Sequence, residues 1–223
     1  MNVIEVERLS VRYGAAVALE NVSLTVAAGE MVALVGSNGA GKSTLLDTLS
    51  GILEKDAGEI RIHGRMAHVP EGRQLFPDLT VDDNLRLGAF RSGDRDTAWV
   101  YEFLPELERT KKQRAGTLSG GQQQMVAIAR GLMSRPDVLA LDEMSLGLAP
   151  IVVQGLSRVL SDLNAQRGLG VLLVEQSVRL AFSLCTRAYV LETGKVVASG
   201  TTEELAHNPF VEGAYLGTPG RAS

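Results

Sequence analysis

A glycine-rich loop between two apolar segments limits what this chain can fold into more than any other feature. Residues 36–44 read GSNGAGKST and directly follow the apolar run at residues 31–35. The glycines at 36, 39 and 41 let the backbone curl so that successive N–H groups point inward, and the positive end of a following helix reinforces this anion cradle. The sequence therefore predicts a buried parallel strand, a phosphate-binding loop and a helix that opens at residues 45–49.

The polar side chains of this loop suit a nucleoside triphosphate. Lys42 is expected to reach the β- and γ-phosphates, and Ser43 is expected to ligate Mg²⁺. The backbone N–H groups around them point at the same phosphates. The expected nucleotide contacts therefore extend over the whole loop: Ser37, Asn38, Gly39, Ala40, Gly41, Lys42, Ser43 and Thr44.

A second glycine turn, LSGGQQQ at residues 118–124, precedes a helical run at residues 125–133. A Ser N-cap with a flexible Gly-Gly entry describes its local geometry, but the turn is also a second anion-binding site at a helix N-terminus. One chain rarely needs two such loops for one nucleotide. We therefore predict a head-to-tail dimer in which each ATP lies between the first loop of one subunit and the second loop of the other. The expected contacts of the second loop are Ser119, Gly120, Gly121 and Gln122.

Two acidic residues follow the apolar run at residues 138–141. Four apolar residues predict a buried strand whose end projects two carboxylates. Asp142 is expected to hold Mg²⁺ through water. Glu143, one residue further and so on the other side of the strand, is expected to polarise the attacking water.

Taken in this order, the three motifs resemble those of the ATP-hydrolysing subunits of ATP-binding-cassette (ABC) transporters, and the resemblance covers nearly the whole chain. It implies an α/β fold with a P-loop NTPase core of the RecA-like type, whose mixed sheet has antiparallel N-terminal strands, and an inserted α-helical subdomain. It also implies that Tyr13 stacks on the adenine and that Glu143 is the general base.

Two positions depart from the commonest form of this family. Glu71 stands after a Val-Pro pair where most members have Gln, and Gln176 stands where most have a switch histidine. The runs at residues 69–73, 79–81, 173–176 and 214–217 are similar to those of the shorter, second ATPase of high-affinity branched-chain amino acid importers. The resemblance implies that Lys42, Glu143 and Gln176 are catalytic and that Ser43, Glu71 and Asp142 ligate the metal.

The function implied is ATP hydrolysis with Mg²⁺ that powers uptake of branched-chain or related amino acids. The implied partners are a second ABC ATPase subunit, in a heterodimer or a homodimer, two membrane permeases and, indirectly, a solute-binding protein. The chain is then held peripherally by the permeases at the cytoplasmic face of the membrane. Residues 74–80, with Phe76 and Leu79 available for an apolar groove, are the region that receives a permease helix in this family.

Two alternative functions stay open at the level of sequence. One is the ATPase of an importer for urea or short amides, where the residue after Val-Pro is more often Gln. The other is a nucleotide-binding regulatory module with low turnover. Gln176 is the reason to consider it, because its amide, unlike a histidine, carries no charge and does not titrate near neutral pH. A cassette ATPase of DNA repair or translation would require a coiled-coil insertion, a tandem second cassette or a basic face, and none of these is visible in the sequence.

Composition agrees with a cytosolic globular chain. The 223 residues are 45% hydrophobic, enough to bury a core, and the net charge of −4 argues against nucleic acid as a partner. The single cysteine, Cys185, excludes an internal disulfide and is expected to pack in a core. No apolar window is long enough to span a membrane, and the N-terminus lacks the order of a signal peptide.

We expect one nucleotide-binding domain over residues 1–223, with an α/β core at residues 1–78 and 134–223 and a helical subdomain at residues 79–133. Core strands are predicted at residues 4–11, 22–26, 59–62, 171–175, 188–191 and 196–199, and core helices at residues 150–166 and 177–185. The helical part is predicted to contain helices at residues 81–90 and 99–107 and the helix after the second glycine turn. The link between the strand at 59–62 and the Val-Pro pair is shorter than in the resembled subunits, which predicts a trimmed surface loop and an undamaged site.

Overall fold

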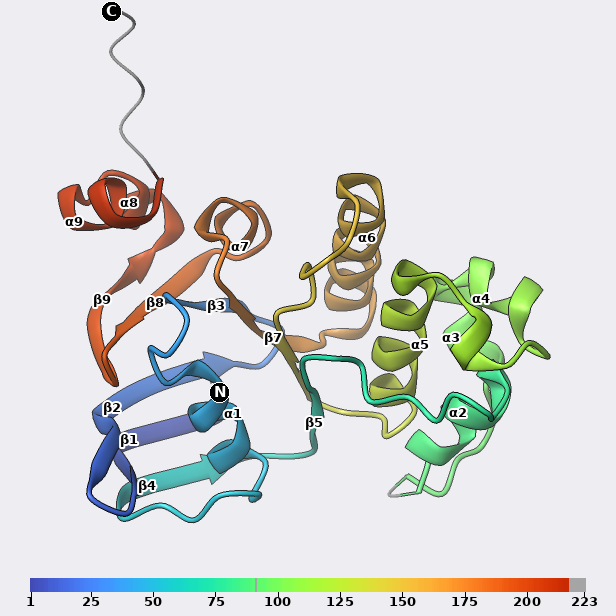
Figure 1. The fold of residues 1–223 in the computed structure, drawn as a ribbon, viewed down its shortest axis with the longest axis horizontal. Coiled ribbons are helices and arrows are strands. Elements are labelled where there is room, and N and C mark those ends of the chain that lie inside the picture. The colour runs from blue at the N-terminus through green and yellow to red at the C-terminus, as the bar shows by residue number, and fades with distance from the viewer. Residues whose placement is uncertain (91, 217–223) are drawn as a thin grey trace, which may run out of the picture.

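The computed structural model describes residues 1–90 and 92–216, and two β-sheets pack against each other in it (Figure 1). The smaller sheet is antiparallel and has the order β2-β1-β4, formed by Ala16–Ala27, Asn2–Tyr13 and Ala57–Ile62. The larger sheet has the order β5-β6-β7-β3-β8-β9, formed by Met66–Val69, Val138–Asp142, Gly170–Glu175, Met31–Val35, Arg187–Glu192 and Lys195–Thr201. Only β9 runs antiparallel within it. The predicted mixed α/β architecture with antiparallel N-terminal strands is confirmed, and those strands form a sheet of their own.

Every residue of β3, β6 and β7 is buried, as their unbroken apolar runs predict for parallel strands covered on both faces. The two faces belong to different cores. Ala33 and Val35 pack into a core with the helices, whereas Val32 and Leu34 pack into a core with the antiparallel sheet. The helix that follows β3 belongs to the second of these cores, because its Leu45 and Leu46 pack there as well.

The connection between β4 and β5 consists of residues 63–65. Asp137 stabilises it, because its Oδ2 accepts a hydrogen bond of 2.7 Å from the Arg65 N–H. β5 still pairs in register with β6 along its whole length. The short link predicted from sequence is therefore compatible with a complete sheet.

Helices α6 (Pro150–Arg167) and α7 (Val178–Leu184) cover one face of the larger sheet, and α1 (Lys42–Leu49) lies on the other side (Figure 1). Both helices predicted for the C-terminal half are present. Cys185 ends α7 and is buried, as expected. Two short helices, α8 (Thr202–Ala206) and α9 (Pro209–Val211), and a π-helical turn at Glu212–Leu216 were not predicted. Gly217, the last residue of a run used for the resemblance, lies outside the described residues.

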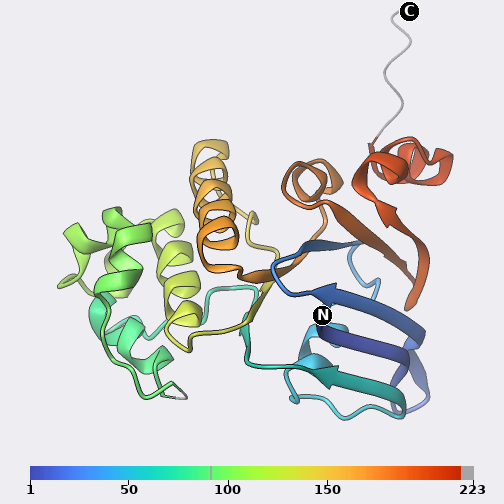
Figure 2. The same ribbon diagram turned by 180° about the vertical axis from the view of Figure 1, so that it is seen from behind.

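The remaining helices gather beside the sheets, with α5 (Gly120–Leu132) next to α6 (Figures 1 and 2). They are α2 (Val81–Gly88), α3 (Ala98–Phe103), α4 (Pro105–Thr110) and a 3₁₀ turn at Ala115–Thr117. The single helix expected at residues 99–107 is wrong, because Leu104 leaves the helical region and Pro105 begins a new helix. The domain boundaries at residues 79 and 133 stay a prediction.

Glycine allows α2 and α5 to approach closely. A Cβ at Gly88 would lie 1.9 Å from the Arg130 carbonyl oxygen, whereas a Cβ at Gly155 on α6 would have nothing within 4 Å. We expect Gly88→Ala to lower the free energy of unfolding by about 3 kcal/mol through overpacking. Gly155→Ala, the matched control, should raise it by about 0.5–1 kcal/mol because alanine favours the helix. Urea denaturation of both variants measures the difference, and equal effects would contradict the close helix contact.

Candidate nucleotide-binding site

A cavity of about 540 Å³ opens beside the N-terminus of α1. It brings together most of the residues that the sequence singled out from the first loop and from four other segments. Those that line it are Tyr13, Asn38, Gly39, Gly41, Lys42, Ser43, Thr44, Glu71, Glu143 and Gln176. Ser37, Ala40 and Asp142 are not among its lining residues, although they are adjacent in sequence to residues that are.

The helix after the first loop begins at Lys42, three residues before the predicted opening at 45. Gly41 explains the earlier start, because it caps the helix with φ 107°, a conformation that only glycine adopts easily. A side chain there would also meet the Ala18 carbonyl oxygen, 2.8 Å from the Cβ position. The tight turn therefore brings the first helical N–H groups up to the cavity.

Lys42 is buried, and its ammonium is held by the loop itself. Lys42 Nζ donates hydrogen bonds to the carbonyl oxygens of Gly36 at 3.0 Å and Ser37 at 3.1 Å. It also lies 3.3 Å from Glu143 Oε1. This cation is thus placed between the loop and the acidic pair, where phosphate oxygens could replace its present partners.

The two acidic residues at the end of β6, Asp142 within the strand and Glu143 just after it, both approach the start of α1. Asp142 Oδ2 accepts a hydrogen bond of 3.1 Å from Ser43 Oγ, while Glu143 pairs with Lys42. The expectation that strand alternation places Glu143 on the other side of the strand is wrong. The strand ends at Asp142, and Glu143 turns away with φ 45°, so its direction is set by a bend.

The surroundings of Asp142 fit a divalent cation. Burial raises the pKa of Asp142 to about 6, with the Ser43 hydrogen bond opposing that rise. Asp142 Oδ1 is buried and has no hydrogen-bond partner among the described residues. Oxygen ligands from Ser43, Asp142 and Glu71 are the type that Mg²⁺ prefers. Among the described residues, no group of three or more His, Cys, Asp or Glu side chains is placed to hold a metal ion.

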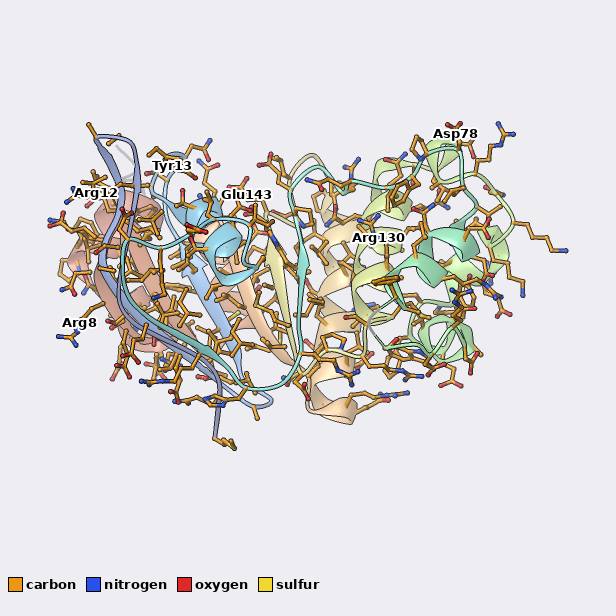
Figure 3. The ribbon with its side chains drawn as sticks, turned by 90° about the horizontal axis from the view of Figure 1, so that it is seen from below. Arg8, Arg12, Tyr13, Asp78, Arg130 and Glu143 are labelled. Carbon is orange, nitrogen blue, oxygen red and sulfur yellow. The ribbon has the colours of Figure 1, made fainter. Side chains whose placement is uncertain are left out.

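Tyr13 and Gln176, which are far apart in the sequence, both line the cavity. Tyr13 ends β1, is 52% exposed and has its Oη 3.5 Å from Thr44 Oγ1. Gln176 follows directly after β7 and is exposed. Figure 3 shows Tyr13 and Glu143 beside the blue helix α1. The aromatic ring is thus free to contact a base, and the amide is free to contact a phosphate.

The second glycine turn lies outside this cavity. Ser119 caps α5 in a reciprocal pair with Gln122: Gln122 N–H donates to Ser119 Oγ, and Ser119 N–H donates to Gln122 Oε1. None of the four residues expected to contact nucleotide from this turn lines the cavity. Within one chain, the structure therefore does not bring the two loops together.

Two contacts that position the site were not predicted from the sequence. Glu175 accepts hydrogen bonds from the Ser145 N–H at 3.1 Å and the Ser145 Oγ at 2.9 Å, which ties the loop after Glu143 to the residue before Gln176. Gly194 N–H donates to the Ala40 carbonyl at 2.9 Å, which anchors the β8-β9 turn on the first loop. The strands predicted at residues 188–191 and 196–199 do pair as a hairpin, but no local pattern indicates where the hairpin packs.

The buried carboxyl of Glu175 is expected to make the nucleotide-free protein less stable as the pH rises. Burial raises the pKa of Glu175 from an ordinary value of 4.5 to about 7, and the hydrogen bonds from Ser145 oppose this rise. Between these values the folded state keeps a proton that the unfolded state has released, so the free energy of unfolding falls with rising pH, and the loss is complete above pH 7. Glu175→Gln removes this titration and keeps an acceptor for Ser145.

The free energy of unfolding of Glu175→Gln, relative to the wild type, should therefore increase by about 2–3 kcal/mol between acid and neutral pH. Urea denaturation across this pH range, with a chelator and without nucleotide, measures the difference. Taking the difference between variant and wild type cancels the other titrating groups that the two proteins share. A difference that stays constant with pH would contradict the raised pKa.

The glycine loop after β3, the buried lysine and the acidic pair at the end of β6 define a P-loop nucleoside-triphosphate-binding protein. The sequence profile of the family described as ABC transporter matches residues 19–145, more than half of the chain. The chain therefore belongs to the ABC transporter family and is an ABC ATPase. No helix in residues 1–90 and 92–216 has the length and apolar character needed to cross a membrane.

Relatives extend the likeness to both ends of the chain. The chain is 46% identical to BraG of Pseudomonas aeruginosa, a high-affinity branched-chain amino acid transport ATP-binding protein, over 95% of this chain and 98% of BraG. It is 36% identical to LptB of Escherichia coli K12, a lipopolysaccharide export system ATP-binding protein, over 89% of this chain and 90% of LptB. The crystal structure of the ADP conformation of an ATP-binding cassette of an ABC transporter superposes with a TM-score of 0.87 at 25% identity, covering 98% of this chain and 100% of that one.

Proposed function

We propose that this chain powers the uptake of branched-chain or related amino acids as the ATP-hydrolysing subunit of an importer. The observation that carries the solute class is the 46% identity to BraG over 95% of the chain. The lower identity to LptB, 36%, favours import of amino acids over export of lipopolysaccharide. The placement of Lys42 and Glu143 in one cavity supports an active site in preference to a regulatory module.

In the proposed reaction, the phosphates of ATP bind the first loop and Tyr13 stacks on the adenine. Lys42 exchanges its present partners for β- and γ-phosphate oxygens, and Gln176 donates an amide hydrogen bond to the γ-phosphate. Glu143 accepts a proton from water as the water oxygen attacks the γ-phosphorus and the bond to the β–γ bridging oxygen breaks, which yields ADP and phosphate.

The oxygen atoms of this site are of the type that binds Mg²⁺. Ser43, Asp142 and Glu71 are the residues that would hold it, and the bound cation would neutralise negative charge on the phosphate oxygens. The unpartnered, buried Asp142 Oδ1 supports this assignment. Three carboxylates near one lysine also leave an excess of negative charge that a cation would relieve.

The second glycine turn serves a neighbouring subunit in this proposal. Because Ser119, Gly120, Gly121 and Gln122 do not line the cavity of their own chain, they are free to contact the nucleotide of a partner ATPase. The partner is a second ABC ATPase, either a copy of this chain or a sibling. ATP then closes the dimer and hydrolysis reopens it.

Permeases hold the ATPase at the cytoplasmic face of the membrane, and a solute-binding protein delivers solute to them. A second cavity of about 550 Å³ supports a docking site for a permease helix, because Phe76, Leu87 and Phe90 line it and Phe76 is 51% exposed. Leu79, which the sequence also suggested, is not among its lining residues. The polar residues in the cavity include Arg130.

The test is solute uptake by source cells whose only copy of this chain is wild type or Glu143→Gln. Loss of labelled leucine uptake with unchanged urea uptake is the expected result. Loss of urea uptake alone would move the chain to the alternative importer class, and no change in either would refute both assignments. Phosphate release by the purified wild-type chain separates an ATPase from a low-turnover regulatory module.

A further inference from the structure

The segment that carries Glu71 has an unusual backbone. Gly72, Arg73 and Gln74 follow one another with φ of 74°, 66° and 46°. Glycine adopts this left-handed conformation freely, but residues with a Cβ do so only when surrounding contacts stabilise it. Glu71, at one end of this segment, lines the nucleotide cavity, and Phe76, at the other, lines the second cavity.

Arg130, near the end of α5, supplies side-chain contacts to this backbone, in addition to the hydrogen bond of 2.7 Å from the Gln74 N–H to the Gly72 carbonyl. Its guanidinium donates hydrogen bonds to the Gln74 carbonyl at 2.8 Å and the Arg73 carbonyl at 3.2 Å. The same group lies 6.0 Å from the centre of the Phe76 ring. Burial lowers the pKa of Arg130, and no ion pair with it is present among the described residues. Main-chain carbonyls therefore stabilise this charge, and the charge in turn holds the strained residues.

Other side-chain hydrogen bonds join this segment to α5 and to α2. Arg73 Nη1 donates to Gln123 Oε1 on α5 at 3.2 Å. The buried side chain of Asn84, on α2, accepts from the Phe76 N–H and donates to the Phe76 carbonyl, both at 3.0 Å. The segment is therefore attached to α2 and α5, while Glu71 points at a cavity built around α1.

We propose that Arg130 is a positioning residue for Glu71, and that it does so by stabilising the left-handed conformation of residues 72–74. Arg130 also lines the second cavity, whereas Glu71 lines the nucleotide cavity. Figure 3 shows Arg130 away from Glu143, toward the green helices, so its effect on the reaction is indirect. This inference rests on the proposed function and adds to it a residue that positions Glu71.

The test compares ATP hydrolysis by four purified variants. Arg130→Gln should lower kcat about tenfold with little change in KM for ATP, because the first loop, which binds the phosphates, is untouched. Arg130→Lys should retain an intermediate kcat, since an ammonium replaces only part of the guanidinium fork. Gln74→Gly in the Arg130→Gln background should restore most of kcat, because glycine adopts the left-handed conformation without help. Arg109→Gln, which alters an exposed arginine on α4, is the matched control and should match the wild type.

Hydrogen–deuterium exchange of the nucleotide-free proteins gives a second readout that does not depend on turnover. Arg130→Gln should accelerate exchange in peptides covering residues 72–76 and leave peptides covering residues 36–44 unchanged. Wild-type kcat together with wild-type exchange in Arg130→Gln would overturn the inference, as would a loss of kcat that Gln74→Gly does not restore. If the wild type itself hydrolyses no ATP, the proposed function fails, and the exchange data alone decide whether Arg130 holds the segment.

Discussion

Replacing Glu143 with glutamine is expected to lower ATP turnover by about 10²–10⁴-fold while ATP still binds. The Glu143 carboxylate lines the nucleotide cavity and lies 3.3 Å from Lys42 Nζ. Glutamine has nearly the same shape, but its amide cannot accept a proton from water at neutral pH. The substitution also removes one negative charge next to the phosphates, so the affinity for ATP should stay the same or increase.

Phosphate release and equilibrium binding of ATP, measured on the same preparation, separate these two effects. Glu102→Gln is a suitable control because Glu102 is an exposed residue of α3 and does not line the nucleotide cavity. A Glu143→Gln protein that turns over ATP near the wild-type rate would remove Glu143 from the role of general base. A protein that no longer binds ATP would show that Glu143 mainly supports the structure of the cavity.

Replacing Lys42 with methionine is expected to weaken ATP binding about 100-fold. Among the described residues that line the cavity, Lys42 alone has a cationic side chain, and it shares the cavity with Glu71 and Glu143. Its removal deletes charge-assisted hydrogen bonds to the phosphates, a loss of about 3 kcal/mol, and leaves the carboxylates to repel them. Methionine keeps most of the buried volume, so the loss should come from charge and not from packing.

Isothermal titration with ATP and Mg²⁺ measures this loss. Lys55→Met provides a matched control, because Lys55 Nζ also donates to a main-chain carbonyl, that of Gly58 at 2.8 Å, but does not line the nucleotide cavity. The control should bind ATP as the wild type does. If Lys42→Met retained wild-type affinity, the phosphates would have to lie elsewhere than in the first loop.

The parts of the site that could be predicted from sequence are those in which neighbouring residues cooperate. The first loop is such a case, since its glycines, its lysine and the strand before it are contiguous, and the structure confirms their arrangement. The acidic pair is another, because Asp142 directly follows four apolar strand residues. Asp142 therefore lies at the end of a buried strand. The roles of these residues in binding and catalysis stay predictions until the variants are measured.

Three predictions from local sequence patterns were wrong because the backbone departs from the regular geometry that each pattern assumes. The periodicity at residues 99–107 resembles one helix, but Leu104 breaks it before Pro105. Strand alternation placed Glu143 opposite Asp142, but alternation applies only within a strand, and Glu143 lies in a bend with φ 45°. The start of α1 moved to Lys42 because Gly41 caps it in a left-handed conformation.

By itself, the sequence determined the class of protein, the phosphate-binding loop and the acidic pair, because their backbone geometry depends on adjacent residues. Only the tertiary structure decided that Ser145 bonds to Glu175, that Arg130 holds the carbonyls of Arg73 and Gln74, and that the second glycine turn lies outside the cavity of its own chain. These contacts join residues far apart in the chain. Their formation depends on how sheets and helices pack, which no local pattern of residue types encodes.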